Sequence, residues 1–173
     1  MKDHRLIVTK GAGNKPFALT TRGKLAEGVS AEAGMVVHRN SSGLFELGVG
    51  SLEVMPLFLW QSDDDFDVSQ GAGAGDPATD LEAYVGIGPE GDMTAFVATG
   101  ATELFSTEYS GADNTFTPNV YLTSPTSTGD AGKLVVTTIG TTTICGMVST
   151  GIDTLQKKKG VRFYPIYIPA SLA

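Results

Sequence analysis

The sequence predicts a single all-β domain, a β-sandwich or a barrel of about eight to ten short strands. Three observations lead to this expectation. Apolar residues occur in short pieces separated by glycine-rich turns, polarity alternates with the period of a strand, and β-branched threonine is frequent. The length of 173 residues suits one domain with its own core.

The first strands are expected between residues 23 and 61. A turn at residues 39–43 joins two apolar pieces, and Asn40 and Gly43 can take the positive φ that a hairpin loop requires. His38 is then expected at a strand end, facing water. Pro56 indicates an edge strand, or a strand that begins after the proline.

The second half of the chain alternates in polarity and is rich in threonine. Residues 116–152 hold only two charged residues, Asp130 and Lys133. Threonine lets a sheet have a wettable outer face without charge, and such a surface suits packing against other protein. Strands are expected within residues 94–111, 119–125, 132–138, 142–152 and 161–170, with a lysine turn at 157–160 before the last strand.

Residues 62–80 are acidic and glycine-rich, and are expected to form a flexible surface loop. A short helix is expected near 77–85, since Asp76 can cap it, Pro77 suits its first position and Gly86 can end it. Calcium binding is a weaker alternative for the loop, because no complete EF-hand pattern accompanies its aspartates. These candidate ligands are Asp63, Asp64, Asp65 and Asp67. No metal or cofactor is otherwise expected.

The charge is distributed unevenly along the chain. The net charge is −7, yet the first 30 residues are basic. We therefore expect an extended basic arm at 1–24 followed by the β-domain at 25–173; the alternative is that 1–24 forms a first strand of that domain. Candidate contacts of the arm with another protein subunit are Arg5, Leu6, Ile7, Val8, Lys10, Lys15, Arg22 and Lys24, and Trp60 is either core or an interface anchor.

Several classes of function have little support in the sequence. The basic residues are spaced out and accompanied only by Phe17, so nucleic-acid binding is not expected. No apolar run reaches the roughly 18 to 20 residues of a membrane span, and the short apolar block near the start does not indicate a signal peptide. The protein is therefore expected to be made and kept in a cytosol.

Catalysis is not expected either. The candidates for nucleophile or metal chemistry are His4, His38 and Cys145, and no nucleophile-elbow motif is present. Cys145 stands in an apolar segment and is expected to be a buried structural residue. Glu103 and Glu108 are separated by an odd number of residues, so on one strand they would face opposite ways.

Within residues 92–169, the segments "ATGATELFSTEY", "TPNVYLTSP…GKL", "GMVSTGI" and "FYPIYIP" are similar to the strand pairs of small structural proteins of tailed bacteriophages. The chain resembles the capsid decoration, or cement, proteins. The resemblance implies a virion protein on the capsid exterior, made in the host cytoplasm, that binds the major capsid protein as a homotrimer. It implies no catalysis, no cofactor, no nucleic acid and no membrane.

Two other functions stay open. One is a different virion appendage or a carbohydrate-binding β-sandwich, which an exposed aromatic cluster involving Trp60, Tyr84 or Tyr109 would favour. The other is an enzyme, which would require a deep pocket lined by carboxylates with raised pKa values.

Overall fold

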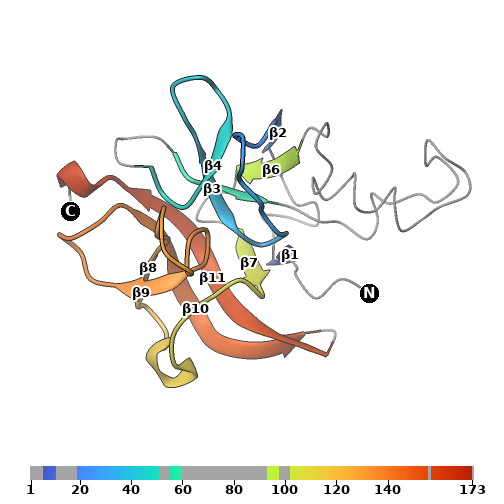
Figure 1. Cartoon of the computed structure of the whole chain (residues 1–173). Helices are drawn as coiled ribbons and strands as arrows, with labels where there is room; N and C mark the ends of the chain where they lie inside the picture. The colour runs from blue at the N-terminus through green and yellow to red at the C-terminus, as the bar shows by residue number, and fades with distance from the viewer. Residues whose placement is uncertain are drawn as a thin grey trace, which may run out of the picture.

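The computed structural model describes residues 6–10, 19–50, 55–59, 93–97, 102–155 and 157–172. These residues form two antiparallel sheets of six and five strands, together with two short 3₁₀ turns, Asp113–Thr115 (η1) and Ala170–Leu172 (η2) (Figure 1). Neither sheet closes into a barrel. The all-β class expected from the sequence is confirmed.

The larger sheet has the order β1-β7-β11-β10-β8-β9. Its centre is the long hairpin of β10 and β11, which pair from Ile144–Ile168 to Leu155–Lys158 with two shifts of register, between Ile144 and Gly146 and between Val148 and Gly151. The strands are β1 (Leu6–Lys10), β7 (Glu103–Ser106), β8 (Tyr121–Thr123), β9 (Val135–Thr137), β10 (Ile144–Leu155) and β11 (Lys158–Ile168).

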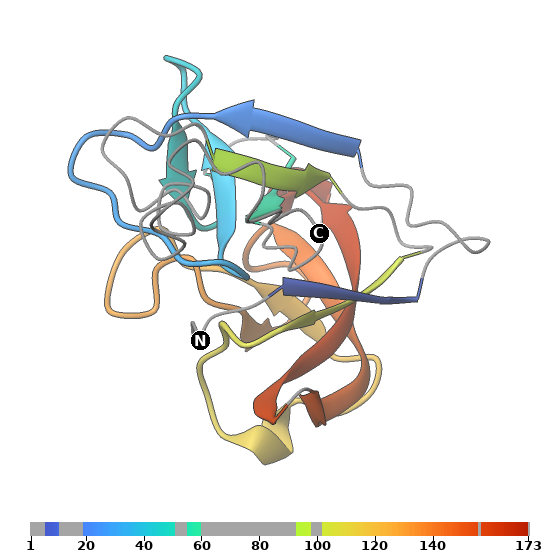
Figure 2. The same ribbon diagram turned by 90° about the vertical axis from the view of Figure 1, so that its right-hand side faces the viewer.

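The smaller sheet has the order β2-β6-β5-β3-β4 and lies beside the larger one (Figure 2). Leu25, just after β2, forms a parallel bridge with Phe45 of β4, so the chain leaving one edge strand meets the strand at the other edge. A single bridge is not a ladder, and the sheet stays open. The strands are β2 (Leu19–Gly23), β3 (Val36–Arg39), β4 (Phe45–Leu47), β5 (Leu57–Leu59) and β6 (Met93–Val97).

The principal core is shared by the two sheets. Phe58 of β5 and Phe163 of β11 are buried, and their ring centroids lie 5.3 Å apart. Val36, Leu104 and Leu122 belong to the same buried cluster. Burial of these side chains, at about 1.5–3 kcal/mol each, holds the sheets together.

The chain after β4 also joins the sheets through its backbone. Gly48 N–H donates to Val36 O at 2.8 Å, and Val49 N–H donates to Ser124 O at 3.0 Å. Gly48 has φ +81°, and a Cβ at this position would overlap the carbonyl oxygen of Pro125. Only glycine combines this left-handed conformation with so close an approach of two backbones.

The β3–β4 hairpin forms where the sequence predicted it. Gly43 has the expected positive φ of +79°, whereas Asn40 contributes its side chain, whose oxygen accepts hydrogen bonds from Ser42 N and Leu44 N at 3.0 Å each. The expectation that His38 faces water is wrong. His38 is 8% exposed and its Nδ1 lies 3.0 Å from Gly48 O, because the chain after β4 folds back over its ring.

Pro56 precedes β5, as one of the two interpretations of that proline predicted. The edge-strand interpretation is wrong, since β5 lies between β6 and β3. Pro56 itself stands outside the strand and is buried, so it removes no ladder hydrogen bond from β5.

Two segments within residues 1–24 are strands of the sheets, so the expectation of an extended arm is wrong for them. Leu6–Lys10 forms β1 and pairs with β7, and Leu19–Gly23 forms β2 and pairs with β6. An edge strand pairs about half of its backbone groups with the neighbouring strand and can bury apolar side chains. An extended arm in water hydrogen-bonds its backbone to water and leaves its apolar side chains exposed. The acidic loop at 62–80 and the helix near 77–85 lie outside the described residues, as does the rest of 1–24.

Candidate functional site

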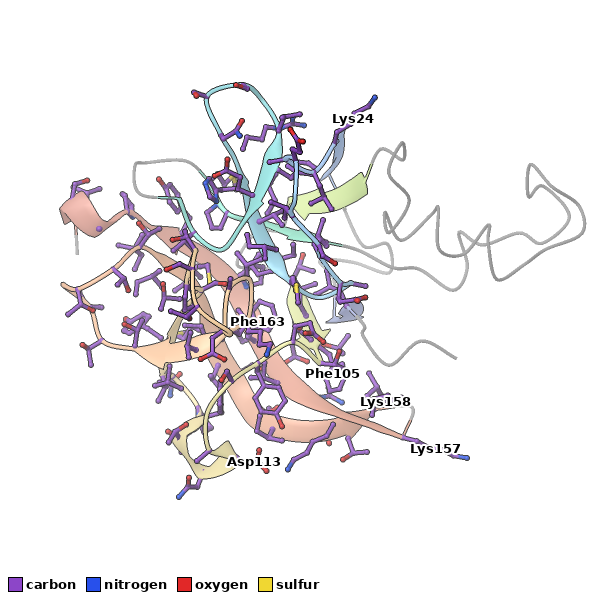
Figure 3. The ribbon with its side chains drawn as sticks, in the orientation of Figure 1. Lys24, Phe105, Asp113, Lys157, Lys158 and Phe163 are labelled. Carbon is purple, nitrogen blue, oxygen red and sulfur yellow. The ribbon has the colours of Figure 1, made fainter. Side chains whose placement is uncertain are left out.

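The β10–β11 hairpin carries different surfaces at its two ends. At its turn lie Asp113, Asp153, Lys157–Lys159 and Arg162, which we call the charged end (Figure 3). At its open end three loops meet, residues 124–129, 138–143 and 169–172, which we call the neutral end because it holds no charged residue.

The charged end is organised by ion pairs. Lys159 Nζ binds Asp113 Oδ2, and the Tyr109 hydroxyl donates to Asp113 Oδ1 at 3.1 Å. The bond from Lys159 lowers the pKa of Asp113, and Asp113 raises that of Lys159. Burial and the neighbouring carboxylate raise the pKa of Tyr109. The cluster therefore keeps its charges over a wide range of pH and fixes η1 to β11.

A second set of bonds links the charged end to the interior. Arg162 Nε donates to Asp153 Oδ2 at 2.6 Å, and Arg162 Nη1 donates to Glu103 Oε1 at 3.3 Å. The Thr9 hydroxyl also donates to Glu103 Oε1, at 2.7 Å. Glu103 is fully buried, so these bonds supply the partners that a buried carboxylate requires.

This network explains Glu103 as a structural residue of the larger sheet. It joins β1, β7 and β11, and its carboxylate is inaccessible to a substrate. Glu108 is also buried, at 5% exposure. Cys145 is buried too, and burial raises the pKa of its thiol well above the usual range.

A metal cluster and a membrane-spanning helix were both sought in the part of the chain that the structure describes. No group of three or more His, Cys, Asp or Glu side chains could hold a metal ion within these residues. Within the same residues, no helix has the length and apolar character to cross a membrane.

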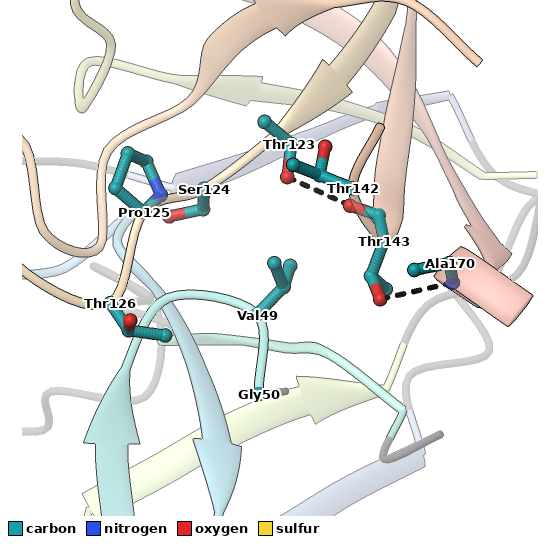
Figure 4. A pocket seen from close by; sticks show the side chains of 9 residues that line it. All are labelled: Val49, Gly50, Thr123, Ser124, Pro125, Thr126, Thr142, Thr143 and Ala170. Carbon is teal, nitrogen blue, oxygen red and sulfur yellow. Dashed lines mark hydrogen bonds between the residues drawn. The ribbon is translucent and has the colours of Figure 1, made fainter. Parts of the chain in front are cut away.

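The neutral end contains a pocket of about 320 Å³ (Figure 4). Its walls are fixed by hydrogen bonds: Thr123 Oγ1 donates to Thr143 O at 2.7 Å, and Ala170 N–H donates to Thr143 Oγ1 at 3.3 Å. The lining consists of small, uncharged residues and includes no carboxylate. They are Val49, Gly50, Thr123, Ser124, Pro125, Thr126, Thr142, Thr143 and Ala170.

Two features mark the loops around this pocket. Two large apolar side chains in these loops are exposed to solvent: Ile139 is 50% exposed and Leu172 is 78% exposed. Thr128, in the loop that also supplies Thr126, has φ +79°, which is unfavourable for a β-branched residue. A surface that retains both exposed apolar groups and backbone strain is a candidate for function.

The contact residues expected from the sequence are only partly placed. Lys24 is exposed, as expected of a contact, whereas Leu6 is fully buried, so its expected contact with a neighbour is wrong. Leu6 packs instead into the core shared by the two sheets. The structure describes the backbone of four further candidates in β1 and β2, but not their side chains: Ile7, Val8, Lys10 and Arg22. The remaining candidates lie outside the described residues: Arg5, Lys15, Trp60, Asp63, Asp64, Asp65 and Asp67.

Sequence reasoning did not identify the neutral end as a site. The signal was present in the scarcity of charge over residues 116–152, but the pocket also needs Val49 and Ala170, which are distant in sequence. Comparison with protein-family models, curated proteins and solved structures gave no match. The resemblance to capsid decoration proteins therefore rests on the sequence pattern of residues 92–169.

Proposed function

We propose that this chain is a structural virion protein that binds the outer surface of an assembled phage capsid and stabilises the contacts between major capsid subunits. The observation that carries the proposal is that the two ends of one long hairpin present chemically different surfaces. The charged end presents exposed Lys157, and the neutral end presents uncharged threonines with Ile139 and Leu172. A protein that holds neighbouring subunits together needs at least two such surfaces.

The physical basis of this function is multivalency. Each copy buries a modest interface, and linkage between copies makes the attachment of the whole cluster much tighter than that of one copy. The lysines at the charged end suit an acidic capsid surface, although the chain as a whole carries −7. The function needs no catalytic group, cofactor or nucleic acid, and it places the protein on the capsid exterior.

The carbohydrate-binding alternative depends on an exposed aromatic cluster. Trp60 and Tyr84 lie outside the described residues. Tyr109 is described, but its hydroxyl bonds Asp113 and its ring packs edge-on against Phe116, with centroids 5.2 Å apart. This arrangement makes Tyr109 part of the charged end and gives sugar binding no added support.

Co-sedimentation with assembled heads tests the proposal. The heads are built from the major capsid protein encoded by the same genome, without this chain. We expect saturable binding that weakens at high salt, because lysine contacts on a surface are screened. Lys157→Glu should weaken it further, whereas Lys133→Glu, which makes the same change in net charge on a half-buried side chain away from the hairpin turn, should not.

Point substitutions are preferable to removal of residues 1–24 because that deletion would take away β1 and β2. Absence of saturable binding by the folded wild-type protein would overturn the proposed function. Equal losses in Lys157→Glu and Lys133→Glu would leave capsid binding in place and overturn the assignment of the charged end.

A further inference from the structure

We propose that the pocket at the neutral end binds a small neutral molecule with an apolar body and one hydroxyl or amide group, and that this group hydrogen-bonds the Ser124 hydroxyl. The site goes beyond capsid attachment and does not depend on it. Three properties of the pocket define the ligand: a buried hydroxyl that has no partner among the described residues, a lining without charge, and a volume of about 320 Å³.

The Ser124 side chain is buried in the wall of the pocket. Ser124 is 0% exposed, and its Oγ has no hydrogen-bond partner among the residues that the structure describes. A buried hydroxyl without a partner is unfavourable, so such groups in native proteins call for a partner from a ligand or an ordered water. Figure 4 shows Ser124 and Pro125 on one side of the pocket, with Thr143 and Ala170 on the other. Rotation about a single bond can turn the Ser124 hydroxyl toward a ligand held between these walls.

The other buried hydroxyls of the lining already have partners. Thr123 Oγ1 donates to Thr143 O at 2.7 Å, and Thr143 Oγ1 accepts the Ala170 N–H at 3.3 Å. A ligand therefore meets one buried hydroxyl that still needs a bond, that of Ser124. The rest of the lining includes the aliphatic side chain of Val49 and the methyl groups of the threonines. This composition fits a ligand with one polar group on an apolar body.

The wall around Ser124 is held in place by its backbone. Ser124 O accepts the Val49 N–H at 3.0 Å, and Pro125 O accepts the Gly132 N–H at 3.0 Å. These bonds fix the chain on both sides of the Ser124 hydroxyl. The pocket is thus formed before a ligand enters, and binding requires little ordering of the protein.

Charge and size limit the ligand further. An ammonium or carboxylate group in this uncharged lining would lose its hydration without gaining an opposite charge, so the ligand is neutral. A cavity of about 150 Å³ can hold benzene, so a pocket of about 320 Å³ has room for a six-membered ring with substituents. A serine hydroxyl can donate or accept a hydrogen bond, so both hydroxyl and amide groups suit it.

Cyclohexanol, a neutral ring with one hydroxyl group, is the probe for this site. We expect it to shift the amide NMR signals of Val49, Ser124 and Thr143 saturably in the isotope-labelled full chain. Ser124→Ala should weaken binding about fivefold to tenfold, as expected for the loss of one hydrogen bond. Cyclohexylammonium and cyclohexanecarboxylate, which carry a charge on the same ring, should not bind.

Ser149→Ala is the matched control and should leave the affinity for cyclohexanol unchanged. The Ser149 hydroxyl is also buried and has no partner among the described residues, but Ser149 is not part of the pocket lining. Ser124→Ala and Ser149→Ala each remove a buried hydroxyl that makes no bond, so neither should unfold the chain, and the same spectra check this.

Each outcome has a distinct meaning. Saturable binding that weakens in Ser124→Ala and not in Ser149→Ala supports the inference. Absence of saturable shifts at the pocket, equal affinity of Ser124→Ala and the wild type, or equal binding of the charged probes overturns it. Co-sedimentation with heads in the presence of cyclohexanol identifies the source of the bound group. Unchanged head binding supports a free small molecule, whereas loss of head binding shows that a neutral capsid side chain fills the pocket and overturns the free ligand, while the proposed function stands.

Discussion

The two ends of the β10–β11 hairpin use opposite physical means to make a surface. The charged end surrounds a turn with ion pairs, from Lys159 to Asp113 and from Arg162 to Asp153 and Glu103. The neutral end has hydrogen-bonded threonines around a pocket and leaves Leu172 in solvent. The ion pairs stabilise local structure, and removing water from their charged groups costs free energy. An uncharged surface with exposed apolar groups costs much less to dehydrate when another protein covers it.

The largest effect should come from breaking the charged end where it reaches the interior. We expect Arg162→Met to destabilise the protein by about 4 kcal/mol, because it removes a cation from the fully buried carboxylate of Glu103. Urea unfolding followed by circular dichroism measures the loss. Asp153→Asn is the control, since it removes only the exposed partner of Arg162 and should cost far less. Equal losses would show that Glu103 does not depend on Arg162.

A somewhat smaller loss should follow from disturbing the wall behind the neutral end. Gly48→Ala should cost about 2–3 kcal/mol, because alanine disfavours φ +81° and its Cβ would overlap Pro125 O. Gly28→Ala is the matched control, with a similar φ of +76° but open space around it, and should cost about 1 kcal/mol. The difference between the two midpoints in urea isolates the contact between the backbones; no difference would contradict it.

Relief of strain at the neutral end should have the opposite sign. We expect Thr128→Gly to stabilise the monomeric fold by about 1 kcal/mol, because glycine accepts φ +79° without the steric cost paid by threonine. Thr126→Gly in the same exposed loop lacks a positive φ and should give no gain. Thermal unfolding compares them. A loss of stability in Thr128→Gly would mean that its side chain contributes more than its backbone costs.

The smallest effect should be the dependence of the charged end on pH. The pKa of Asp113 is lowered from 3.8, so its contribution is present above that value and is lost as pH falls through the folded pKa. The pKa of Lys159 is raised from 10.5, so its contribution is present below that value and is lost as pH rises through the folded pKa. Asp113→Asn should flatten both limbs of the stability–pH profile, as measured by urea midpoints, whereas Asp130→Asn should leave them unchanged.

Local pattern predicted most of the strands and little of the site. The hairpin at residues 36–47 and the strands after Glu103 follow from alternation and turn residues, which act over a few positions. The turn expected at residues 157–160 is wrong in its extent: β11 already begins at Lys158, and of the three lysines Lys157 and Lys159 are exposed whereas Lys158 is half-buried. The pocket was out of reach because it unites Val49, Thr123, Thr143 and Ala170, and short-range patterns do not say which strands become neighbours.

The sequence by itself determined the all-β class, the position of the β3–β4 turn and the low charge of the surface at the open end of the hairpin, because these depend on composition, on turn residues and on period-two alternation. Tertiary structure alone decided that residues 6–10 and 19–23 are edge strands, that His38 and Glu103 are buried, and that Val49, Thr123 and Ala170 line one pocket. The physical reason is that alternation assigns a side chain to a face of its strand, whereas pairing and burial depend on contacts between segments distant along the chain.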